Sequence, residues 1–346
     1  MIIASDIKAI LAEDIGWHRF LGKTVLVSGA AGFLPAYMVE TLLELARRNP
    51  ANPPHVVGLV RNLEAARTRL GDNPFLTLLE QDMGEPLNYD GAADFVIHAA
   101  SQASPRFYRD DPVGTFNANV FGTQSLLALS RGRKTQAFLF FSSGEVYGNA
   151  PIVPTPENVF GPIDPAALRS CYGEGKRAGE TLCVAWAHQH GVPTRIVRPF
   201  HTYGPGMKLD DGRVFADFVA AIIARRDIVI KSDGKARRPF CYSADAVRAF
   251  FRVLLEGGDG IPYNVGNDQA ELSIRELADL LVAEFSERDL RVIMDASQIA
   301  ANYMQSPIVR NCPDISRLRE LGWVPRTGVA EGFRRTVTAY EESGTG

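Results

Sequence analysis

Short apolar runs alternate with longer helical patterns over the first two hundred residues. The runs at 23–28, 56–60, 76–80, 94–99, 137–141 and 194–198 contain almost no polar alternation, which is typical of parallel strands buried on both faces. Helical spacing of apolar residues follows the first run and continues to about residue 47. This alternation predicts an α/β fold built on a doubly wound parallel sheet.

The pattern changes at both ends of this series. Residues 1–22 are expected to form a helical appendage, because Ile7, Ile10 and Leu11 share one helical face within 6–15. Residues 23–200 are the expected dinucleotide-binding core. After residue 200 the alternation relaxes, and 201–346 are expected to form a smaller C-terminal α/β lobe that mainly binds substrate and is interleaved with the core. Its expected elements are a strand near 228–231, a helix that follows Arg213 and continues to about 225, and helices at 273–287, 314–321 and 329–340.

A glycine turn joins the first strand to the first long helix of the core. Gly29 and Gly32 allow backbone N–H groups and the helix N-terminus to approach a pyrophosphate closely. Phe33 and Leu34 continue from this turn, and Pro35 lies in the first helical turn, where proline is tolerated. The turn therefore predicts a Rossmann-type dinucleotide site.

The following strands end in residues that suit the rest of a dinucleotide. Arg61 ends the second strand, where an acidic residue would bind the ribose diol of NAD, so NAD and NADP both remain open. His98, at the fourth strand, is expected to be structural rather than catalytic. Asn119 is an expected cofactor contact, although a buried amide at this position could equally have a structural role. The other expected contacts, for adenine and for the middle of the cofactor, are Asp82, Met83, Ala99, Ala100 and Ser101.

The candidate chemistry lies after the fifth strand and at the start of the next helix. Ser142-Ser143-Gly144-Glu145 emerges at the carboxyl end of a buried strand, which is the ligand-binding edge of such sheets. Tyr172 and Lys176 are four residues apart on a helical pattern and project to the same side. A lysine beside a phenol favours the phenolate, and Ser143 can hydrogen-bond the same oxygen. This set is suited to oxidising a secondary alcohol by hydride transfer.

Composition narrows the classes of partner. The 346 residues carry a formal net charge of -3, and 22% are charged, so no nucleic-acid or membrane surface is expected. No apolar run reaches the length of a membrane span, and no signal peptide is expected. The four cysteines lack metal-ligand spacing, so neither a metal site nor a disulfide framework is expected, and the reducing cytoplasm is the expected location.

Taken in order, these motifs resemble the extended short-chain dehydrogenase/reductases, specifically the NAD-dependent nucleotide-sugar epimerases and dehydratases. The resemblance covers nearly the whole chain, and its motifs are most similar to UDP-glucuronate decarboxylases and NDP-sugar 4,6-dehydratases. The motifs that carry it are Gly29-x-x-Gly32, Ser142-Ser-x-Glu-Val-Tyr-Gly148, Tyr172-x-x-x-Lys176, Arg198-Pro-x-x-x-Tyr-Gly-Pro205 and Arg238-x-Phe-x-Tyr242.

The resemblance implies a carbohydrate-biosynthetic enzyme that oxidises the sugar at C4 to a 4-keto intermediate and regenerates NAD. Tyr172 would remove the C4 hydroxyl proton, Lys176 would also hold the nicotinamide ribose, and Ser143 would orient the C4 oxygen. Glu145 would act near C5. Arg213 and Arg238 would bind the base and diphosphate of the nucleotide sugar. Relatives of this kind also suggest a homodimer formed by the helices that follow the fourth and fifth strands.

Three positions depart from the patterns of these relatives. Gly144 replaces the Asp of dTDP-glucose dehydratases and the Ser of decarboxylases, although it remains an expected substrate contact. His201, also expected at the substrate, replaces a usual Asn. Asn311 stands where decarboxylases carry an Arg, and Arg310 lies one residue earlier. Decarboxylation, 4,6-dehydration and epimerisation at C4, C3 or C5 therefore remain open, as does a catalytically silent dinucleotide-binding regulator, against which the intact Ser143, Tyr172 and Lys176 argue.

Overall fold

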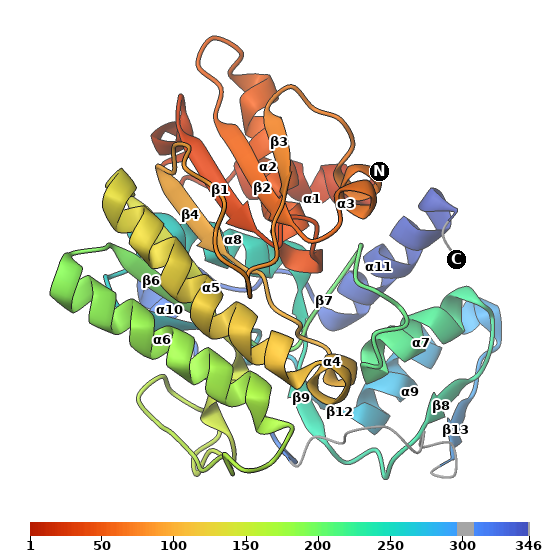
Figure 1. Ribbon diagram of the computed structural model, residues 1–346. Coiled ribbons are helices and arrows are strands. Elements are labelled where there is room, and N and C mark those ends of the chain that lie inside the picture. Colours follow the sequence, from red (N-terminus) through yellow and green to blue (C-terminus); the bar gives the residue numbers. More distant parts are fainter. Residues whose placement is uncertain (296–307, 345–346) are drawn as a thin grey trace.

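A seven-stranded parallel sheet forms the centre of the protein (Figure 1). The computed structural model describes residues 1–295 and 308–344. The strand order is β11-β6-β5-β4-β1-β2-β3, and every neighbouring pair is parallel. The six strands expected from the sequence are present as β1 (Thr24–Ser28), β2 (His55–Val60), β3 (Leu76–Glu80), β4 (Phe95–His98), β5 (Ala137–Phe141) and β6 (Thr194–Pro199), and β11 (Ile261–Val265) adds an edge.

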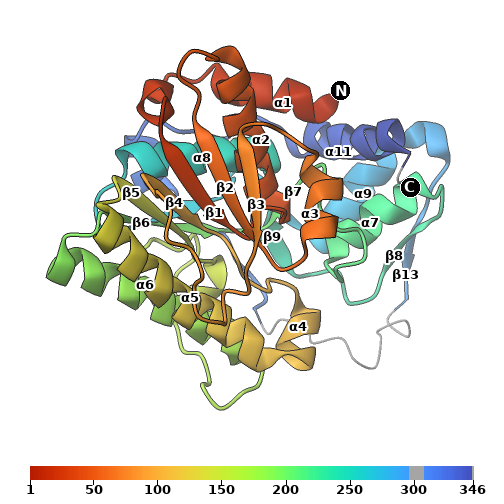
Figure 2. The same cartoon turned by 45° about the horizontal axis from the view of Figure 1, so that its top comes forward.

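Helices cover both faces of this sheet, which makes it doubly wound (Figures 1 and 2). One face packs against α5 (Pro112–Arg133) and α6 (Ser170–His190), and the other against α2 (Phe33–Arg48) and α8 (Ser243–Glu256). Successive strand residues alternate between the two cores: Val25 and Val27 join the α2/α8 side, whereas Leu26 joins the α5/α6 side.

The chain reverses direction across the sheet next to β1. β1 pairs with β2 on one side and with β4 on the other. The strands after β1 therefore continue toward one edge of the sheet as β2 and β3, and those after β4 continue toward the other edge as β5 and β6. Ligands of open α/β sheets bind in the crevice that this reversal opens at the carboxyl ends of the strands. The short helices α3 (Leu63–Leu70), α4 (Pro105–Asp110) and η2 (Gly144–Tyr147) all follow strands at this edge.

The second half of the chain builds a smaller α/β lobe beside the crevice (Figure 1). Three two-stranded sheets support it, pairing β7 (Thr202–Tyr203) with β10 (Cys241–Tyr242), β8 (Ile228–Ile230) with β13 (Val292–Met294), and β9 (Arg237–Pro239) with β12 (Glu271–Ser273). A capping box between Ser273 and Glu276 begins α9. The helices of the lobe are α7 (Val214–Ile223), α9 (Ile274–Glu284), η3 (Ser286–Arg288) and α11 (Val329–Ser343). The short helix α10 (Ser316–Glu320) packs instead against β11 of the central sheet.

The N-terminal helix connects the core to this lobe. It forms α1 (Ile2–Leu11), four residues earlier than the expected 6–15, and is followed by η1 (Trp17–Phe20). Asp6 is buried on α1 and accepts hydrogen bonds from Tyr37 of α2 (3.2 Å), from Tyr242 of β10 (2.7 Å) and from Arg335 of α11. Burial raises the pKa of this carboxyl. One buried side chain thus joins α1 to both parts of the molecule.

None of the helices in the described ranges is both long and apolar enough to cross a membrane.

Candidate active site

A cavity of about 700 Å³ opens at the carboxyl ends of β4, β5 and β6, between the core and the smaller lobe. This volume is typical of small-molecule sites. Twelve of the residues expected at a site line it together: Phe33, Leu34, Ala99, Ser101, Ser143, Gly144, Glu145, Tyr172, Lys176, His201, Arg213 and Arg238.

Tyr172 and Lys176 enter this cavity from the first turns of α6. Both side chains are buried, with exposed fractions of 7% and 2%. The Lys176 ammonium donates to the backbone carbonyl of Phe141 at the end of β5, and its Nζ lies 5.7 Å from the centroid of the Tyr172 ring. The Tyr172 hydroxyl is within hydrogen-bond reach of Ser143. The tyrosine, the lysine and the serine thus meet as the sequence spacing predicts.

The expectation that Lys176 lowers the pKa of Tyr172 is wrong for the protein without bound ligands. Burial raises the pKa of Tyr172 to about 12, and the Ser143 hydrogen bond lowers it only in part. Burial also lowers the pKa of Lys176 to about 7. The helical spacing correctly places Tyr172 beside Lys176. It does not show that both side chains are buried away from water, or that the Lys176 ammonium donates to the Phe141 carbonyl.

The buried lysine makes stability depend on pH. The folded protein releases the Lys176 proton near pH 7, whereas the ordinary value is 10.5, so between these values the unfolded chain binds one more proton. The free energy of unfolding should therefore rise with pH across this window, by up to about 1.4 kcal/mol per unit. Lys176→Met should remove this contribution in urea titrations at several pH values. The exposed Lys208→Met is the control; an unchanged slope in Lys176→Met would contradict the assignment.

Glu145 lies beside Tyr172 and has two neighbours that sequence reasoning missed. Arg169, the residue before α6, places its Nη1 2.8 Å from the Glu145 carboxylate. Tyr108 of α4 stacks on the Tyr172 ring with centroids 4.9 Å apart and planes 19° apart. Both line the cavity. The three-residue spacing of Arg169 and Tyr172 could have revealed the first, whereas no periodic signal marks Tyr108 on its six-residue helix.

Gly144 has little room for a side chain. A Cβ at this position would lie 3.1 Å from two carbons of the Phe200 ring, so a serine or aspartate would require the ring to shift by a few tenths of an ångström. Position 144 therefore supplies no side-chain proton donor to the cavity wall, and the Phe200 ring lies behind it.

Arg213 and Arg238 of the smaller lobe form a cationic region in the same cavity, next to His201. Arg213 is held by Asp211 (2.6 Å), and Arg238 donates to the carbonyls of Ile308 (2.7 Å) and Val309 (3.1 Å). Burial and these two guanidinium groups hold the pKa of His201 well below its usual value, so the ring is neutral. Its buried Nδ1 meets no hydrogen-bond partner within the described ranges. The region suits a phosphate-bearing ligand.

The neighbouring residues Arg310 and Asn311 lie in different surroundings. Asn311 lines the cavity, whereas the guanidinium of Arg310 is bound by both carboxylate oxygens of Glu271 (2.6 and 2.8 Å). Arg310 therefore does not replace the arginine that the resemblance expects at position 311.

The turn between β1 and α2 fits a dinucleotide. Gly29 has φ +69°, and a Cβ there would lie 2.8 Å from the Cα of Ala100, so the turn and the end of β4 approach as only glycine allows. Gly32 precedes the first residue of the long helix α2, whose N-terminus suits a pyrophosphate. Ser101 presents a buried hydroxyl that lacks a hydrogen-bond partner among the described residues. Phe33 and Leu34, which follow this turn, line the same cavity as Tyr172 and Lys176.

Four other sequence-selected residues lie outside the cavity. Asp82 accepts a hydrogen bond from the Gly84 N–H (2.8 Å) in an exposed turn, and Met83 is buried beside it. Asn119 is buried, and its Nδ2 donates to the Thr115 carbonyl (2.7 Å) within α5. His98 is buried 2.6 Å from the Ser28 hydroxyl, and burial lowers its pKa to about 3, which agrees with the structural role expected for it.

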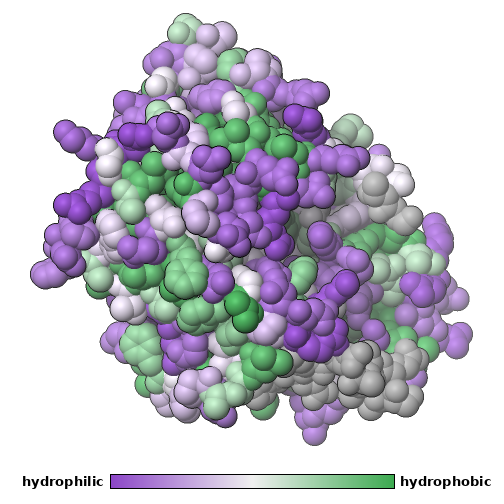
Figure 3. Space-filling model, in the orientation of Figure 1, coloured by the Kyte–Doolittle hydropathy of each residue, from purple (hydrophilic) through white to green (hydrophobic). Residues whose placement is uncertain are grey.

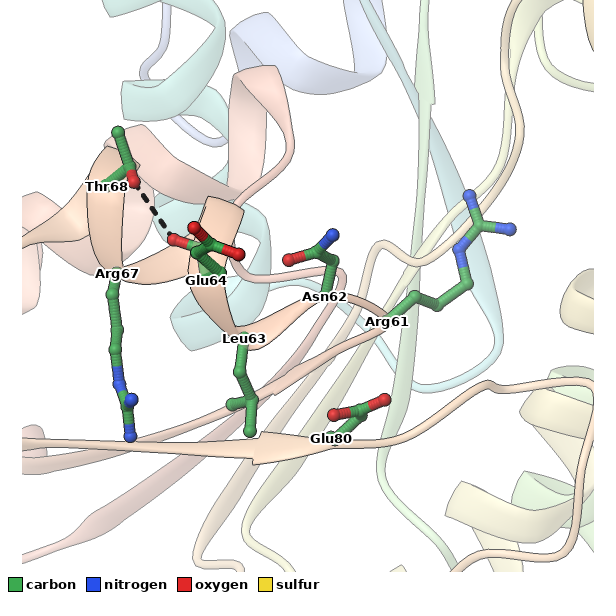
Figure 4. A pocket seen from close by; sticks show the side chains of 7 residues that line it. All are labelled: Arg61, Asn62, Leu63, Glu64, Arg67, Thr68 and Glu80. Carbon is green, nitrogen blue, oxygen red and sulfur yellow. Dashed lines mark hydrogen bonds between the residues drawn. The ribbon is translucent and has the colours of Figure 1, made fainter.

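Arg61 belongs to a second pocket, of about 550 Å³, where β2 meets α3 (Figure 4). Its guanidinium points away from Arg67 and Thr68, and the carboxylates of Glu64 and Glu80 lie between the two arginines along the wall. The full lining is Arg61, Asn62, Leu63, Glu64, Arg67, Thr68 and Glu80. Charges of both signs therefore surround this pocket.

Comparisons with known proteins agree on one family. The sequence model of the NAD dependent epimerase/dehydratase family matches residues 25–266. UDP-glucuronic acid decarboxylase 3 of Arabidopsis thaliana is 37% identical over 311 residues, which cover 89% of this chain and 86% of the relative. UDP-glucuronic acid decarboxylase 1 of Xenopus tropicalis is 32% identical over 327 residues, 92% of this chain and 72% of the relative.

Solved structures share the fold. A UDP-glucose 4-epimerase from Thermotoga maritima, with UDP-glucose bound, superposes with a TM-score of 0.77 at 23% identity, covering 92% of this chain and 99% of that one. A dTDP-glucose 4,6-dehydratase from Streptomyces venezuelae, with NAD bound, gives a TM-score of 0.75 at 24% identity, covering 92% and 97%.

Proposed function

Because the chain belongs to the NAD-dependent epimerase/dehydratase family, we propose that it oxidises a nucleotide sugar at C4 and then acts at C5. The observation that carries this proposal is that Tyr172, Ser143 and Glu145 line one cavity with the cationic region of the smaller lobe. The relatives at 37% identity make UDP-glucuronate the favoured substrate and decarboxylation the favoured reaction. Dehydration to a 4-keto-6-deoxy sugar is the related outcome at the same carbon.

In this account Tyr172 acts as its phenolate, which the positive charge of oxidised NAD would favour against the effect of burial, and takes the proton of the C4 hydroxyl. Ser143 holds the C4 oxygen beside it. Bound NAD would accept the C4 hydride and return it at the end of the cycle. The resulting C4 ketone can accept the electron pair released at C5 when carbon dioxide leaves. A proton then returns to C5, and this transfer is assigned to Glu145, which lines the same cavity as Tyr172. Arg213 and Arg238 bind the phosphates.

Epimerisation through the same ketone is the second candidate, and it has its own support. Gly144 cannot donate a proton, and the neutral Asn311 lines the cavity where the decarboxylase pattern has an arginine. An epimerase needs only to remove and return hydrogen without losing a carbon.

Incubation of the purified protein with UDP-, dTDP-, GDP- and CDP-sugars in heavy water, followed by mass spectrometry, tests these reactions. Loss of carbon dioxide from UDP-glucuronate is the expected result. Loss of water would identify a dehydratase. An isomer of the substrate that separates from it in chromatography, with or without deuterium, would identify an epimerase. Absence of turnover across the whole panel would refute the proposed function.

The cofactor is proposed to be NAD, with NADP as the alternative because of Arg61. Glu80 and Glu64 share the Arg61 pocket and would repel a 2′-phosphate. NAD should therefore bind at least about tenfold more tightly than NADP, a difference of about 1.4 kcal/mol. Calorimetric titration of both dinucleotides checks this. Glu80→Gln should strengthen NADP binding alone; tighter binding of NADP by the unaltered protein would show that Arg61 sets the preference.

A homodimer is also proposed, through α5 and α6. The apolar Leu126 and Leu127 of α5 are fully buried in the core of the chain and lend no support. The support comes from Val113, Phe121 and Val184, which are 67%, 55% and 48% exposed on these helices. Figure 3 shows apolar side chains interspersed with polar ones over this face. Sedimentation equilibrium tests the proposal, and a monomer mass would refute it.

The proposed location is the cytoplasm, in keeping with four free cysteines. Cell fractionation with an antibody tests it.

A further inference from the structure

Arg169 forms the ion pair that fixes Glu145 in the cavity. Its Nη1 lies 2.8 Å from Oε2 of Glu145, and the two side chains are 21% and 24% exposed. A charge-assisted hydrogen bond at this distance restricts the direction of a carboxylate more than water contacts do. The pair is therefore built into the wall of the site rather than exposed on the surface.

The same guanidinium also meets the aromatic pair at the catalytic tyrosine. Its Cζ is 5.9 Å from the centroid of the Tyr108 ring, and Tyr108 stacks on Tyr172. Cation–π contact of this kind is attractive and directional. Arg169 and Tyr172 are three residues apart at the start of α6, so one helix end sets the spacing between the C4 base and Glu145.

Two other arginines of this region form ion pairs with carboxylates other than Glu145. Arg310 is held outside the cavity by Glu271, and Arg213 is held by Asp211. Positions 144 and 311, which line the cavity, carry a glycine and a neutral amide. Arg169 is therefore the cation that the described structure places against Glu145.

We propose that Arg169 is a positioning residue for the second half of the reaction. It aims the Glu145 carboxylate at the C5 side of the sugar and acts through Glu145, without taking part in hydride removal from C4. This inference rests on the proposed function, because it requires a step at C5 that follows oxidation at C4.

Arg169→Met tests the inference because it keeps the length of the side chain and removes the charge. In single turnovers with the favoured sugar nucleotide, absorbance of the reduced nicotinamide should appear at a rate within about threefold of the unaltered enzyme. Product should form at least about thirtyfold more slowly, so reduced cofactor and oxidised sugar accumulate. The steady-state kcat should fall while KM changes less than about threefold.

Two further variants separate positioning from a general structural effect. Arg169→Lys keeps the charge and should recover part of the rate of product formation. If thermal unfolding shows that Arg169→Met folds poorly, the rate of Arg169→Lys tests the inference in its place. Arg169→Met combined with Glu145→Gln should be no slower than Glu145→Gln alone, because the arginine acts through the carboxylate. Arg275→Met, which removes an exposed ion pair with Asp279 on α9, is the matched control.

Normal product formation by Arg169→Met would overturn the inference. Equal slowing of cofactor reduction and product formation, or additive losses in the double variant, would overturn it as well. If the unaltered protein reduces its cofactor with none of the sugar nucleotides, the proposed function itself fails, and this result is distinct from failure of the arginine's role.

Discussion

Tyr172→Phe should lower turnover by at least about a thousandfold, because the variant lacks the group that takes the C4 hydroxyl proton. The ring should remain stacked on Tyr108, since the two centroids lie 4.9 Å apart and the contact does not use the hydroxyl. Binding of dinucleotide and nucleotide sugar should therefore change little. Pre-steady-state absorbance of the reduced nicotinamide, together with calorimetric binding of both ligands, measures the two effects separately.

The matched control is Tyr89→Phe, which removes a hydroxyl that bonds the Ala92 carbonyl far from the cavity. Its turnover should stay within about twofold of the unaltered enzyme. A Tyr172→Phe variant that still reduced its cofactor at the normal rate would mean that another group takes the proton.

Glu145→Gln should separate the two halves of the reaction. Oxidation at C4 needs Tyr172 and Ser143, which remain, so the reduced nicotinamide should appear at nearly the normal rate. Product formation should fall by about a hundredfold or more, because proton transfer by a positioned carboxylate contributes on this scale. Quenched reactions analysed by mass spectrometry should contain the 4-keto sugar before any product.

Glu174→Gln provides the comparison, since Glu174 lies on α6 but pairs with Arg177 away from the cavity. The role assigned to Glu145 would be untenable if its glutamine variant completed the cycle at the normal rate. Loss of cofactor reduction in this variant would instead place Glu145 in the first half of the reaction.

Much of the core followed from local patterns. Mainly apolar runs predicted six strands of the parallel sheet, because strands buried on both faces carry little polar alternation. The edge strand β3 is the exception, since it is partly exposed and contains Thr77 and Glu80. The seventh, β11, contains Pro262 and a buried Asn264 and so did not look like a strand. Proline is tolerated there because β11 is an edge strand. The Asn264 amide is satisfied by the carbonyls of Thr155 and Asp314, which only the tertiary fold brings near.

The part of the site that depends on local spacing was also predictable from the sequence. Helical spacing was enough to bring Tyr172 and Lys176 together, because the two lie on one element. The pKa direction of Tyr172 was not predictable, since burial by Tyr108 and its surroundings depends on a distant segment. The Arg169–Glu145 pair likewise depends on the tertiary fold, because it joins η2 to the residue before α6, 24 positions apart in the sequence.

The most direct test of the account follows the C4 hydrogen through one cycle. UDP-glucuronate carrying deuterium at C4 would be incubated with the protein and NAD in ordinary water, and the product analysed by mass spectrometry and NMR. The account predicts a sugar nucleotide that has lost carbon dioxide and keeps the deuterium at C4, because the same hydride is removed and returned. A product without the C4 deuterium, or one unchanged at both C5 and C6, would contradict it.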